Sequence, residues 1–275
     1  MPEGPELLYF STLLRKKLKN YTFVDIKSYT NKPVIIPKDF GVKIINIDSK
    51  GKLMWFEVLS KDEKKTYYIH IHYGITGWFE FQKPDKNIKF EFIFKNINND
   101  KELIIYLEDR RRFSKINILN KEDHNKKLEK LGIDIFSKEF TIEQFKNIIT
   151  SKNTLLAALL LNQNIFSGIG NYIKNESLYL TKLNIKIKTS QLDDKNITNL
   201  YNNILFVAYS NLYEMLKDSN INTKYLLECK KINKPTKLEV PYIYKIYGRE
   251  KTIDGKQVYK IKVGGRDSYC IKELC

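Results

Sequence analysis

Residues 88–94 read Ile-Lys-Phe-Glu-Phe-Ile-Phe, and they say more about the architecture than any other short stretch. Bulky apolar residues return there at every second position, the repeat of a strand whose alternate side chains point to opposite faces. Runs with the same enrichment in β-branched and aromatic residues follow one another on both sides. They predict strands at 42–47, 53–59, 67–72, 78–81, 88–94, 103–107 and 113–119. Many short strands at such spacing are typical of a β-sandwich or barrel.

Helical periodicity precedes and follows this β-rich region. Apolar residues recur at helical spacing near the start, at Leu7, Phe10, Leu14 and Leu18, and predict an amphipathic helix over 5–19. Beyond a charged stretch from 120 to 130, further helices are predicted at 141–150, 154–162, 171–182, 191–217 and 221–228. The tail returns to strands at 242–247, 257–263 and 268–272, with Gly264-Gly265 as a hairpin turn. The chain is therefore expected to be of the α+β class.

Length and composition narrow the cellular setting. The 275 residues can form one large domain or two ordinary ones. The longest aliphatic run, 155–161, is far shorter than the roughly 20 residues of a membrane span, and the first residues lack a signal-peptide pattern. Three cysteines cannot all pair with one another, which favours a reducing compartment. We expect a soluble, intracellular protein, in either the nucleus or the cytoplasm.

The charge balance indicates an anionic partner. The formal net charge is +16, and the last 47 positions hold 12 basic against 5 acidic residues. Such an excess concerns partners rather than fold, and it favours a polyanion such as a nucleic acid. A genome rich in A and T would also raise lysine usage, but it would not cluster the charge at one end.

The amino terminus carries a candidate nucleophile. Residues 2–6 read Pro-Glu-Gly-Pro-Glu directly behind Met1. Removal of Met1 would leave Pro2 as a free secondary amine, and an α-amino group has a reference pKa of about 7.7–8.0. Amines of this kind attack electrophilic carbons, and the adduct of proline with an aldehyde-level carbon is an iminium with a fixed positive charge. The same residues are also typical of a helix start, with proline in the first turn and acids near its positive end.

A second motif is a candidate phosphate site. Gly168-Ile169-Gly170-Asn171 stands immediately before a predicted helix. Flexible glycines that open onto a helix N-terminus present free backbone N–H groups to an anion. The pattern is equally common as ordinary turn punctuation.

A third motif combines cations with an aromatic ring. Asp109-Arg110-Arg111-Arg112-Phe113 lies between two predicted strands. Guanidinium groups pair with phosphates and stack on bases, and phenylalanine can wedge between base steps. The alternative is a solvated run of charge beside a buried phenylalanine.

Metal binding is not favoured. His70 and His72 share one face of a predicted strand and could hold a metal, but a third suitable ligand is not evident. Cys270 and Cys275, with the distant Cys229, form a poor zinc pattern. We therefore expect neither a metal nor a cofactor.

Taken in order, these pieces resemble the formamidopyrimidine-DNA glycosylase/endonuclease VIII family of base-excision repair enzymes. The matching residues are 2–6, Gly51-Lys52, 71–77, 109–113, 167–172 with 176–178, 247–249 and Gly265-Arg266, which together span nearly the whole chain. Each match is weak alone, and the ordered set is specific. One departure is clear, because the four cysteines of a C-terminal zinc finger are missing. The chain thus resembles endonuclease-VIII-like members with a zincless finger, in which strand pairing and packing of Tyr244, Tyr259 and Tyr269 would hold the hairpin.

The resemblance implies a division into domains. Residues 1–122 would form a catalytic β-sandwich with an N-terminal helix, and 123–140 a linker. Residues 141–275 would form a helix–two-turns–helix domain whose last part, from about 241, is a β-hairpin finger.

The resemblance also implies roles for individual residues. Pro2 would be the nucleophile, Glu3 the general acid and base at the sugar, and Lys52 a further catalytic and phosphate-binding residue. Supporting active-site carboxylates would be Glu6 and Glu176. Phosphate contacts would come from Lys52, His72, Gly170, Asn171 and Arg266. The gap left by a flipped base would be filled by Ile75, Arg111 and Phe113.

The sequence thus predicts a bifunctional DNA glycosylase and AP lyase. It would excise oxidised bases, foremost oxidised pyrimidines and ring-opened or hydantoin lesions, through a Schiff base of Pro2 followed by β/δ-elimination. Damaged double-stranded DNA would be the partner, with single-stranded or bubble DNA as further substrates, and the protein would be a monomer. The alternatives are a non-catalytic damaged-DNA-binding protein and a general nucleic-acid-binding protein, which would bind without preference for lesions.

Overall fold

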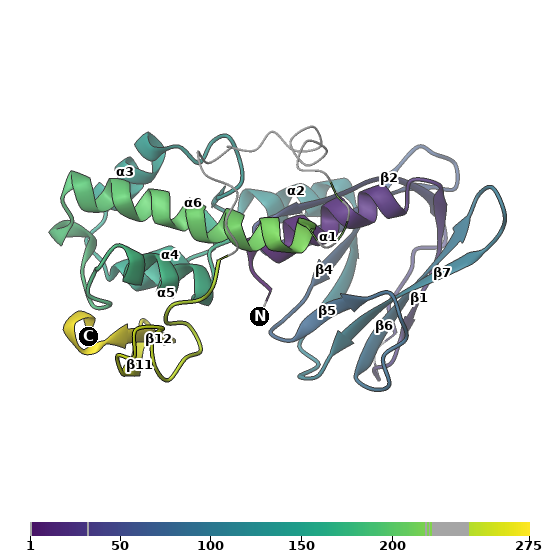
Figure 1. Ribbon diagram of the computed structural model, residues 1–275. Helices are drawn as coiled ribbons and strands as arrows, with labels where there is room; N and C mark the ends of the chain where they lie inside the picture. Colours follow the sequence, from purple (N-terminus) through teal and green to yellow (C-terminus); the bar gives the residue numbers. More distant parts are fainter. Residues whose placement is uncertain (1, 32, 218, 220, 222–241) are drawn as a thin grey trace. The chain divides into compact units, whose positions relative to one another are not determined.

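The computed structural model describes residues 2–31, 33–217, 219, 221 and 242–275. The chain divides into two compact units, Met1–Lys130 and Leu131–Cys275. Figure 1 shows the elements of each unit. Among the described residues, none of the helices combines the length and the apolar character needed to cross a membrane.

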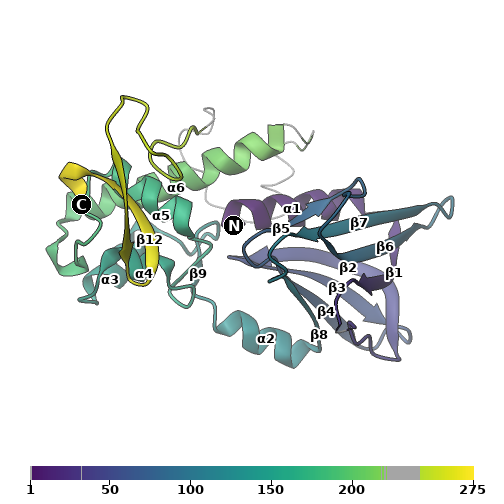
Figure 2. The same cartoon turned by 90° about the horizontal axis from the view of Figure 1, so that it is seen from below.

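The first unit combines a large antiparallel sheet with two helices, α1 and α2. The sheet order is β5-β7-β6-β1-β2-β3-β4-β8, and Figure 2 labels all eight strands. The elements are α1 (Gly4–Lys17), β1 (Tyr21–Ser28), β2 (Phe40–Lys50), β3 (Leu53–Ser60), β4 (Thr66–His72), β5 (Gly77–Glu80), β6 (Ile88–Asn96), β7 (Glu102–Asp109), β8 (Lys115–Leu119) and α2 (Lys121–Glu129). The predicted β-rich first half and its N-terminal helix are confirmed.

Alternation along β6 forms the centre of this unit's core. Phe90, Phe92 and Phe94 are all buried, as their spacing predicts. Phe92 and Phe94 stack against Phe56 of β3, with ring centroids 6.0 Å apart in both pairs. Aromatic rings bury large areas, so this cluster holds the two layers of the sandwich together.

Helix α1 begins where its sequence supplies a cap. Glu3 is the N-cap, and its side chain accepts from the N3 backbone while the Glu6 side chain accepts from the Glu3 backbone N–H. This reciprocal arrangement satisfies two of the N–H groups that a helix start leaves free. Basic residues occupy the last turn, where they favour the negative end of the helix dipole. The apolar face predicted from Leu7 and Leu14 is buried against the sheet.

The second unit is helical and carries a C-terminal hairpin. Its elements are β9 (Ile133–Asp134), α3 (Ile142–Thr150), α4 (Leu156–Leu161), β10 (Phe166–Ser167), α5 (Asn171–Leu180), η1 (Thr189–Gln191), α6 (Asp194–Lys217), β11 (Val258–Val263), β12 (Arg266–Ile271) and η2 (Lys272–Leu274). Figure 2 shows β12 beside α4 and α5. Helices, sandwich and hairpin together confirm the α+β class.

The hairpin turn is the one that its glycines predict. β11 and β12 are antiparallel, with Val263 opposite Arg266, so Gly264 and Gly265 alone form the connection. Both glycines have positive φ, 57° and 77°. Two positive φ values in a two-residue loop match the twist of the flanking strands, and only glycine and a few other residues tolerate them.

Several sequence-based boundaries were wrong. Strand β1 was missed, because Asp25 and Lys27 interrupt its apolar pattern and its register shifts between Phe23 and Asp25. The strand predicted from 113 begins only at Lys115. Residues 242–247 form no strand, for a reason given below. The charged stretch after 120 holds α2, capped by Asn120, whose side chain accepts from the Asp123 N–H. The helix predicted at 221–228 lies outside the described residues, apart from residue 221.

The cysteines also differ from expectation. Cys270 and Cys275 are joined by a disulfide, with their Cα atoms 5.5 Å apart. The odd cysteine count had favoured a reducing compartment, in which such a bond is rare. The disulfide links the end of β12 to the last residue of the chain, across η2.

Candidate active site and nucleic-acid interface

The first residues of α1 form a buried, acid-rich helix start. Pro2 is buried, and Glu3 is 1% exposed. The Glu3 backbone N–H donates to Glu6 Oε2 at 2.7 Å. The capping box therefore fixes the backbone next to Pro2, and the carboxylates of Glu3 and Glu6 follow Pro2 one and four positions along the chain.

Lys52 occupies the turn between β2 and β3. Lys50 pairs with Leu53, so Gly51 and Lys52 alone form the turn, and Gly51 has φ 56°. The Lys52 side chain is partly exposed.

Two contacts of α1 orient its start relative to this turn. Arg15 donates to Ile47 O at 2.8 Å, and Ser11 Oγ lies 3.0 Å from Ser49 Oγ. Helix α1 and strand β2 therefore run in opposite directions, so residues nearer the start of α1 lie beside residues nearer the end of β2. From Ser11 to Glu3 the helix rises about 12 Å, and from Ser49 to Lys52 a strand spans about 10 Å. The beginning of α1 therefore lies toward the Lys52 turn.

A buried carboxylate joins two loops that contain the predicted void-filling residues. Asp109 is fully buried, and its Oδ1 accepts from Thr76 Oγ1 at 2.5 Å while its Oδ2 accepts from the Ser114 N–H at 2.6 Å. The Arg111 N–H donates to Thr76 Oγ1 at 2.9 Å. Burial opposes ionisation of Asp109, but the hydrogen bonds from Thr76 and Ser114 outweigh it and hold the pKa of this carboxyl below its usual value. Asp109 is thus an ionised centre for the 109–114 loop.

Close packing reinforces that junction. A Cβ on Gly74 would lie 2.8 Å from Phe113 Cβ, and Gly74 also has φ 64°. Only glycine fits this place without a shift of the neighbouring loop. Ile75 follows Gly74 directly, so the structure brings Ile75, Arg111 and Phe113 together on two loops that are locked to each other.

Two residues of the 109–114 loop, Arg111 and Phe113, are exposed. Phe113 is 51% exposed, and the Arg111 guanidinium carbon lies 5.0 Å from the centroid of its ring. An exposed aromatic ring beneath a guanidinium is a stacking surface. The alternative of a buried Phe113 is therefore wrong.

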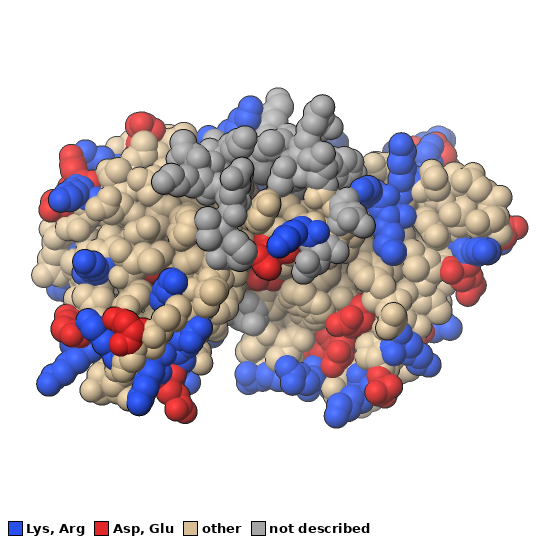
Figure 3. Space-filling view, viewed as in Figure 1, with Lys and Arg blue, Asp and Glu red and all other residues tan. Residues whose placement is uncertain are grey.

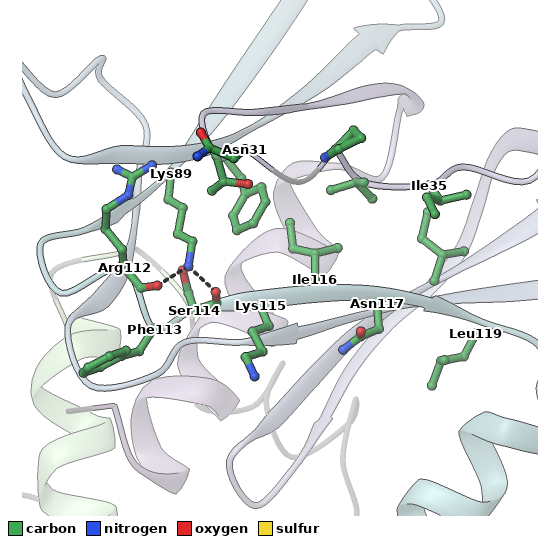
Figure 4. Close-up of a pocket in the computed structure, with 15 residues that line it drawn as sticks. Asn31, Ile35, Lys89, Arg112, Phe113, Ser114, Lys115, Ile116, Asn117 and Leu119 are labelled. Atoms are coloured by element: carbon green, nitrogen blue, oxygen red, sulfur yellow. Dashed lines mark hydrogen bonds between the residues drawn. The ribbon is translucent and has the colours of Figure 1, made fainter.

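Lys89 of β6 holds the 109–114 loop through hydrogen bonds to its backbone, and the sequence did not point to this residue. Its buried ammonium donates to the carbonyls of Arg112 and Ser114 (Figure 4). Burial lowers the pKa of Lys89. Arg112 has φ 55°, an uncommon conformation that this ammonium helps to hold.

Beside Lys89 lies a cavity of about 760 Å³, between β8 and residues 30, 31 and 33–35. Figure 4 shows Ile116 on the side of Ile35, whereas Lys115 and Asn117 project to the other side of the strand. The residues that line the cavity include none of the acids of α1 and not Lys52. The cavity is therefore distinct from the helix start, and its walls near β8 are mainly apolar.

His70 and His124 form an internal pair. His70 is fully buried, and its Nε2 lies 2.8 Å from Nδ1 of His124 on α2. His124 stacks on Tyr68 with centroids 3.7 Å apart. Burial, and then the neighbouring His124, lower the pKa of His70 to about 3, so the pair is neutral at ordinary pH. His72 is partly exposed at the end of β4, opposite Lys115, and burial lowers its pKa as well.

In the second unit, the loop before α5 is shaped by one amide. Gln163 donates to Ile169 O at 2.8 Å and accepts from the Gly168 N–H at 3.1 Å. Gly168 has φ 102°, and Gly170 is the N-cap of α5. Asn171 follows as the first helical residue, and its Oδ1 is buried without a hydrogen-bond partner among the described residues. The loop therefore leads into the N-terminus of α5, a favourable place for an anion, and the side-chain oxygen of Asn171 there accepts no hydrogen bond within the described part of the chain.

Glu176 organises the segment after 241. Its Oε1 accepts from the N–H groups of Ile246 at 3.0 Å and Tyr247 at 2.6 Å, and its Oε2 accepts from that of Lys245 at 2.8 Å and from the Tyr242 hydroxyl. Burial, and then the Glu176 charge, raise the pKa of Tyr242 far above its usual value. These backbone groups are thereby taken from any sheet, which explains why 242–247 is not a strand.

Arg266 stands at the exposed tip of the hairpin. It follows Gly265 directly and is exposed. Figure 3 shows Lys and Arg side chains, mixed with a few acids, over the β11–β12 hairpin. The packing behind it differs in part from prediction, because Tyr247 contacts Tyr244 and Tyr269 at 5.9 and 5.2 Å, whereas Tyr259 is 43% exposed.

The predicted site residues thus form groups within each unit. In the first unit, Pro2, Glu3 and Glu6 share a helix start that lies toward Lys52. The void-filling residues share a second locality there. His72 belongs to neither group and lies at the end of β4. In the second unit, the start and body of α5 and the hairpin carry the rest of the predicted set, namely Gly170, Asn171, Glu176 and Arg266.

Comparison with known families agrees with this division. The model of the formamidopyrimidine-DNA glycosylase N-terminal domain matches residues 1–116, and that of the formamidopyrimidine-DNA glycosylase H2TH domain matches residues 131–220. A formamidopyrimidine-DNA glycosylase of Prochlorococcus marinus is 30% identical over 206 residues, which cover 65% of this chain and 69% of that protein. One of Arabidopsis thaliana is 27% identical over 303 residues, covering the whole chain and 70% of that protein.

Solved structures share the fold at low sequence identity. The Lactococcus lactis formamidopyrimidine-DNA glycosylase, bound to DNA with an AP site, has a TM-score of 0.72 and 20% identity, with 98% of this chain and 97% of that one covered. The Thermus thermophilus protein gives 0.70 and 20%, with 98% and 96% covered. On the domain matches and the Prochlorococcus relative together, the chain belongs to the formamidopyrimidine-DNA glycosylase family, whose members are DNA-repair glycosylases.

Proposed function

We propose that this protein is a bifunctional DNA glycosylase and AP lyase whose nucleophile is the Pro2 amine, exposed by removal of Met1. The observation that carries the proposal is the helix start, where the buried Pro2 precedes an N-cap glutamate that is bonded to Glu6. The capping box is made by Glu3 and Glu6, so the cap itself does not use Pro2. An amine held rigidly beside carboxylates suits a reaction that needs both a nucleophile and proton transfer.

The chemistry follows from these groups. The Pro2 nitrogen attacks C1′ of the damaged nucleotide and the bond from C1′ to the base breaks. The amine loses its proton in this step and the leaving base gains one, so the step balances. The ring then opens as Glu3 delivers a proton to the sugar oxygen, which leaves an iminium between Pro2 and C1′. The iminium draws electrons from the neighbouring C2′–H bond, so the C2′ proton is lost and the 3′ phosphate is expelled. Water then releases the sugar and restores the amine. Glu6 supports the reaction by fixing the Glu3 backbone.

The two loops around Asp109 suit the stage before chemistry. A flipped nucleotide leaves a gap in the duplex, and unstacking and unpairing it costs a few kcal/mol. Arg111 and Phe113 belong to a loop that is held to the loop of Ile75 by the hydrogen bond from the Arg111 N–H to Thr76 and by the close packing of Gly74 on Phe113. We assign these three residues to the gap, because wedge residues must be held rigidly to offset unstacking.

Phosphate binding is assigned to both units. Lys52 and His72 are partly exposed on the first unit, and Arg266 is exposed on the second. Gly170 and Asn171 begin α5, where the helix dipole and free N–H groups favour anions. We assign Glu176 a supporting role through the 242–247 segment that it orders.

Oxidised bases are the proposed substrates, foremost oxidised pyrimidines and ring-opened or hydantoin lesions. Support comes from Lactococcus lactis relatives of the same fold, which were solved with DNA that contains Fapy-dG and with DNA that contains an oxidised pyrimidine. We further propose an endonuclease-VIII-like member whose finger works without zinc. The hairpin has its own small core of Ile246, Val258 and Ile271, which supports that assignment.

A panel of duplexes with single lesions tests the proposal. Base release and strand scission are scored separately, with wild type beside Glu3→Gln. The proposal expects both products from wild type on at least one oxidised base, and loss of base release with retained binding for the variant. Tight binding to lesions without any product would favour a damaged-DNA-binding protein instead, and equal binding to intact DNA a general nucleic-acid-binding protein.

A further inference from the structure

Two of the phosphate-binding residues assigned to the second unit, Asn171 and Arg266, are connected through α5. We propose that Lys174 and Asn175 are positioning residues, which fix the hairpin so that Arg266 and Asn171 engage the DNA backbone together. The inference rests on the proposed function and adds to it the part of the chain that sets this geometry.

Lys174 anchors the hairpin directly behind Arg266. It lies within α5 and is fully buried, and its ammonium donates to Ser268 Oγ at 2.7 Å and to Asp267 O at 3.1 Å. Lysine is almost never fully buried unless its charge is satisfied, because desolvation of an ammonium is expensive. Both acceptors belong to the two residues that follow Arg266. A buried charge therefore fixes the backbone on which the arginine stands.

Asn175 connects the same strand to the start of α5. Its Oδ1 accepts from the Tyr269 N–H at 2.9 Å, and its Nδ2 donates to Asn171 O at 2.7 Å. One amide thus links Asn171 itself to β12. Any movement of the strand along α5 would break this contact and the Lys174 contacts together.

The turn supplies a third point of support. A Cβ on Gly264 would lie 2.7 Å from Ala158 Cβ of α4, so the turn sits directly on that helix. Strand β12 itself packs on α5, as Figure 2 shows. Arg266 lies between this support and the Lys174 contacts, which leaves its backbone little freedom. The carboxylate of Asp267 meanwhile pairs with Lys260 at 3.0 Å, and its carbonyl faces Lys174.

Fixed spacing matters because hydrogen bonds to phosphate weaken steeply outside a narrow range of distance and angle. An arginine on a free hairpin would have to be ordered at each encounter, and that ordering would reduce affinity. The three supports perform this ordering during folding.

The test compares Lys174→Met, which keeps the length of the side chain and removes the ammonium, with Lys186→Met as control. Lys186 is exposed in the same unit, and its replacement changes the net charge equally. The dissociation constant for a duplex with a tetrahydrofuran abasic analogue is measured over a series of salt concentrations. We expect Lys174→Met to weaken binding about tenfold and to lower the salt slope by about one, as for a lost phosphate contact. Lys186→Met should stay close to wild type.

A double variant separates positioning from a general structural role. In an Arg266→Ala background, Lys174→Met should weaken binding no further, because the residue that it positions is gone. If instead the two effects multiply, Lys174 acts independently of Arg266 and the inference is overturned. It is also overturned if Lys174→Met binds like wild type while Arg266→Ala does not. If Arg266→Ala itself binds like wild type, the proposed phosphate role fails first.

Should Lys174→Met fold poorly, Ser268→Ala provides the same comparison with a smaller change. It removes one acceptor of the ammonium and leaves the charge in place. The expected loss of affinity is about threefold, again only when Arg266 is present. An equal loss with and without Arg266 would contradict the inference.

Discussion

Mild acid should destabilise the first unit through the buried His70–His124 pair. His70 is fully buried, and its Nε2 contacts His124 Nδ1 at 2.8 Å. Its folded pKa is about 3, against 6.5 for an ordinary histidine. Between these values the unfolded chain binds a proton that the folded chain does not, so stability rises with pH through this window and is lost as pH falls.

The size of the effect follows from those two values. At pH 5 the unfolded histidine is almost fully protonated and the folded one almost fully neutral. Relative to pH 7, His70 alone should lower the free energy of unfolding by about 2 kcal/mol. The loss is nearly the same for any folded pKa well below 5, because His70 then stays neutral at both pH values. His72 and His124, whose pKa values are also lowered chiefly by burial, should add to it.

The chain offers a selective assay. Its two tryptophans, Trp55 and Trp78, and all three histidines lie in the first unit. Trp55 also contacts His124, with ring centroids 5.1 Å apart. Urea unfolding followed by tryptophan fluorescence at pH 7 and pH 5 therefore reports on the unit that contains the pair.

His70→Gln is the matched variant. It retains a polar group that can bond to His124, but it does not titrate in this range. We expect the difference between pH 7 and pH 5 to shrink by about 2 kcal/mol in the variant, whatever its absolute stability. An unchanged difference would refute the assignment of His70 as a buried neutral base.

Three further changes test other parts of the account. Glu176→Gln should destabilise the second unit by about 2–4 kcal/mol, because a neutral amide cannot accept all the hydrogen bonds that the buried carboxylate accepts; hydrogen exchange at the backbone of 242–247 would check this, and unchanged protection would contradict it. Arg111→Ala and Phe113→Ala should slow excision of a paired lesion while leaving cleavage of a pre-formed abasic site nearly intact, and equal loss on both substrates would indicate a general binding or folding role. Gly264→Ala should cost about 1–3 kcal/mol from positive φ and the clash with Ala158, measured by thermal unfolding, and wild-type stability would show that the turn does not rest on α4.

Much of the fold could be read from local pattern. The alternation around Phe92 and the glycines at Gly264-Gly265 predicted a core strand and a two-residue turn, because both signals depend only on neighbours in sequence. β1 escaped because its bulge interrupts that local signal. The 242–247 segment was misassigned because its backbone partners are the oxygens of Glu176, far away in sequence.

The same distinction applies to the candidate site. Residues in compact motifs, such as Pro2, Asn171 and Arg266, could be named from the sequence. Lys89 and Lys174 could not, because a lysine in a strand or helix ordinarily faces solvent, and only the tertiary structure shows what their ammonium groups bind. The His70–His124 contact likewise joins β4 to a helix that had been expected to be part of a linker.

Borohydride trapping determines whether the Pro2 amine attacks C1′. Enzyme and lesion-bearing or abasic DNA are mixed with borohydride, which would reduce the iminium to a permanent cross-link, and the attached sugar is located by peptide mapping. The account predicts a cross-link on Pro2, lost when Met1 is retained or the terminus is acetylated, since either change removes the free secondary amine. A cross-link on Lys52, or efficient trapping and excision by protein with a blocked terminus, would contradict the account.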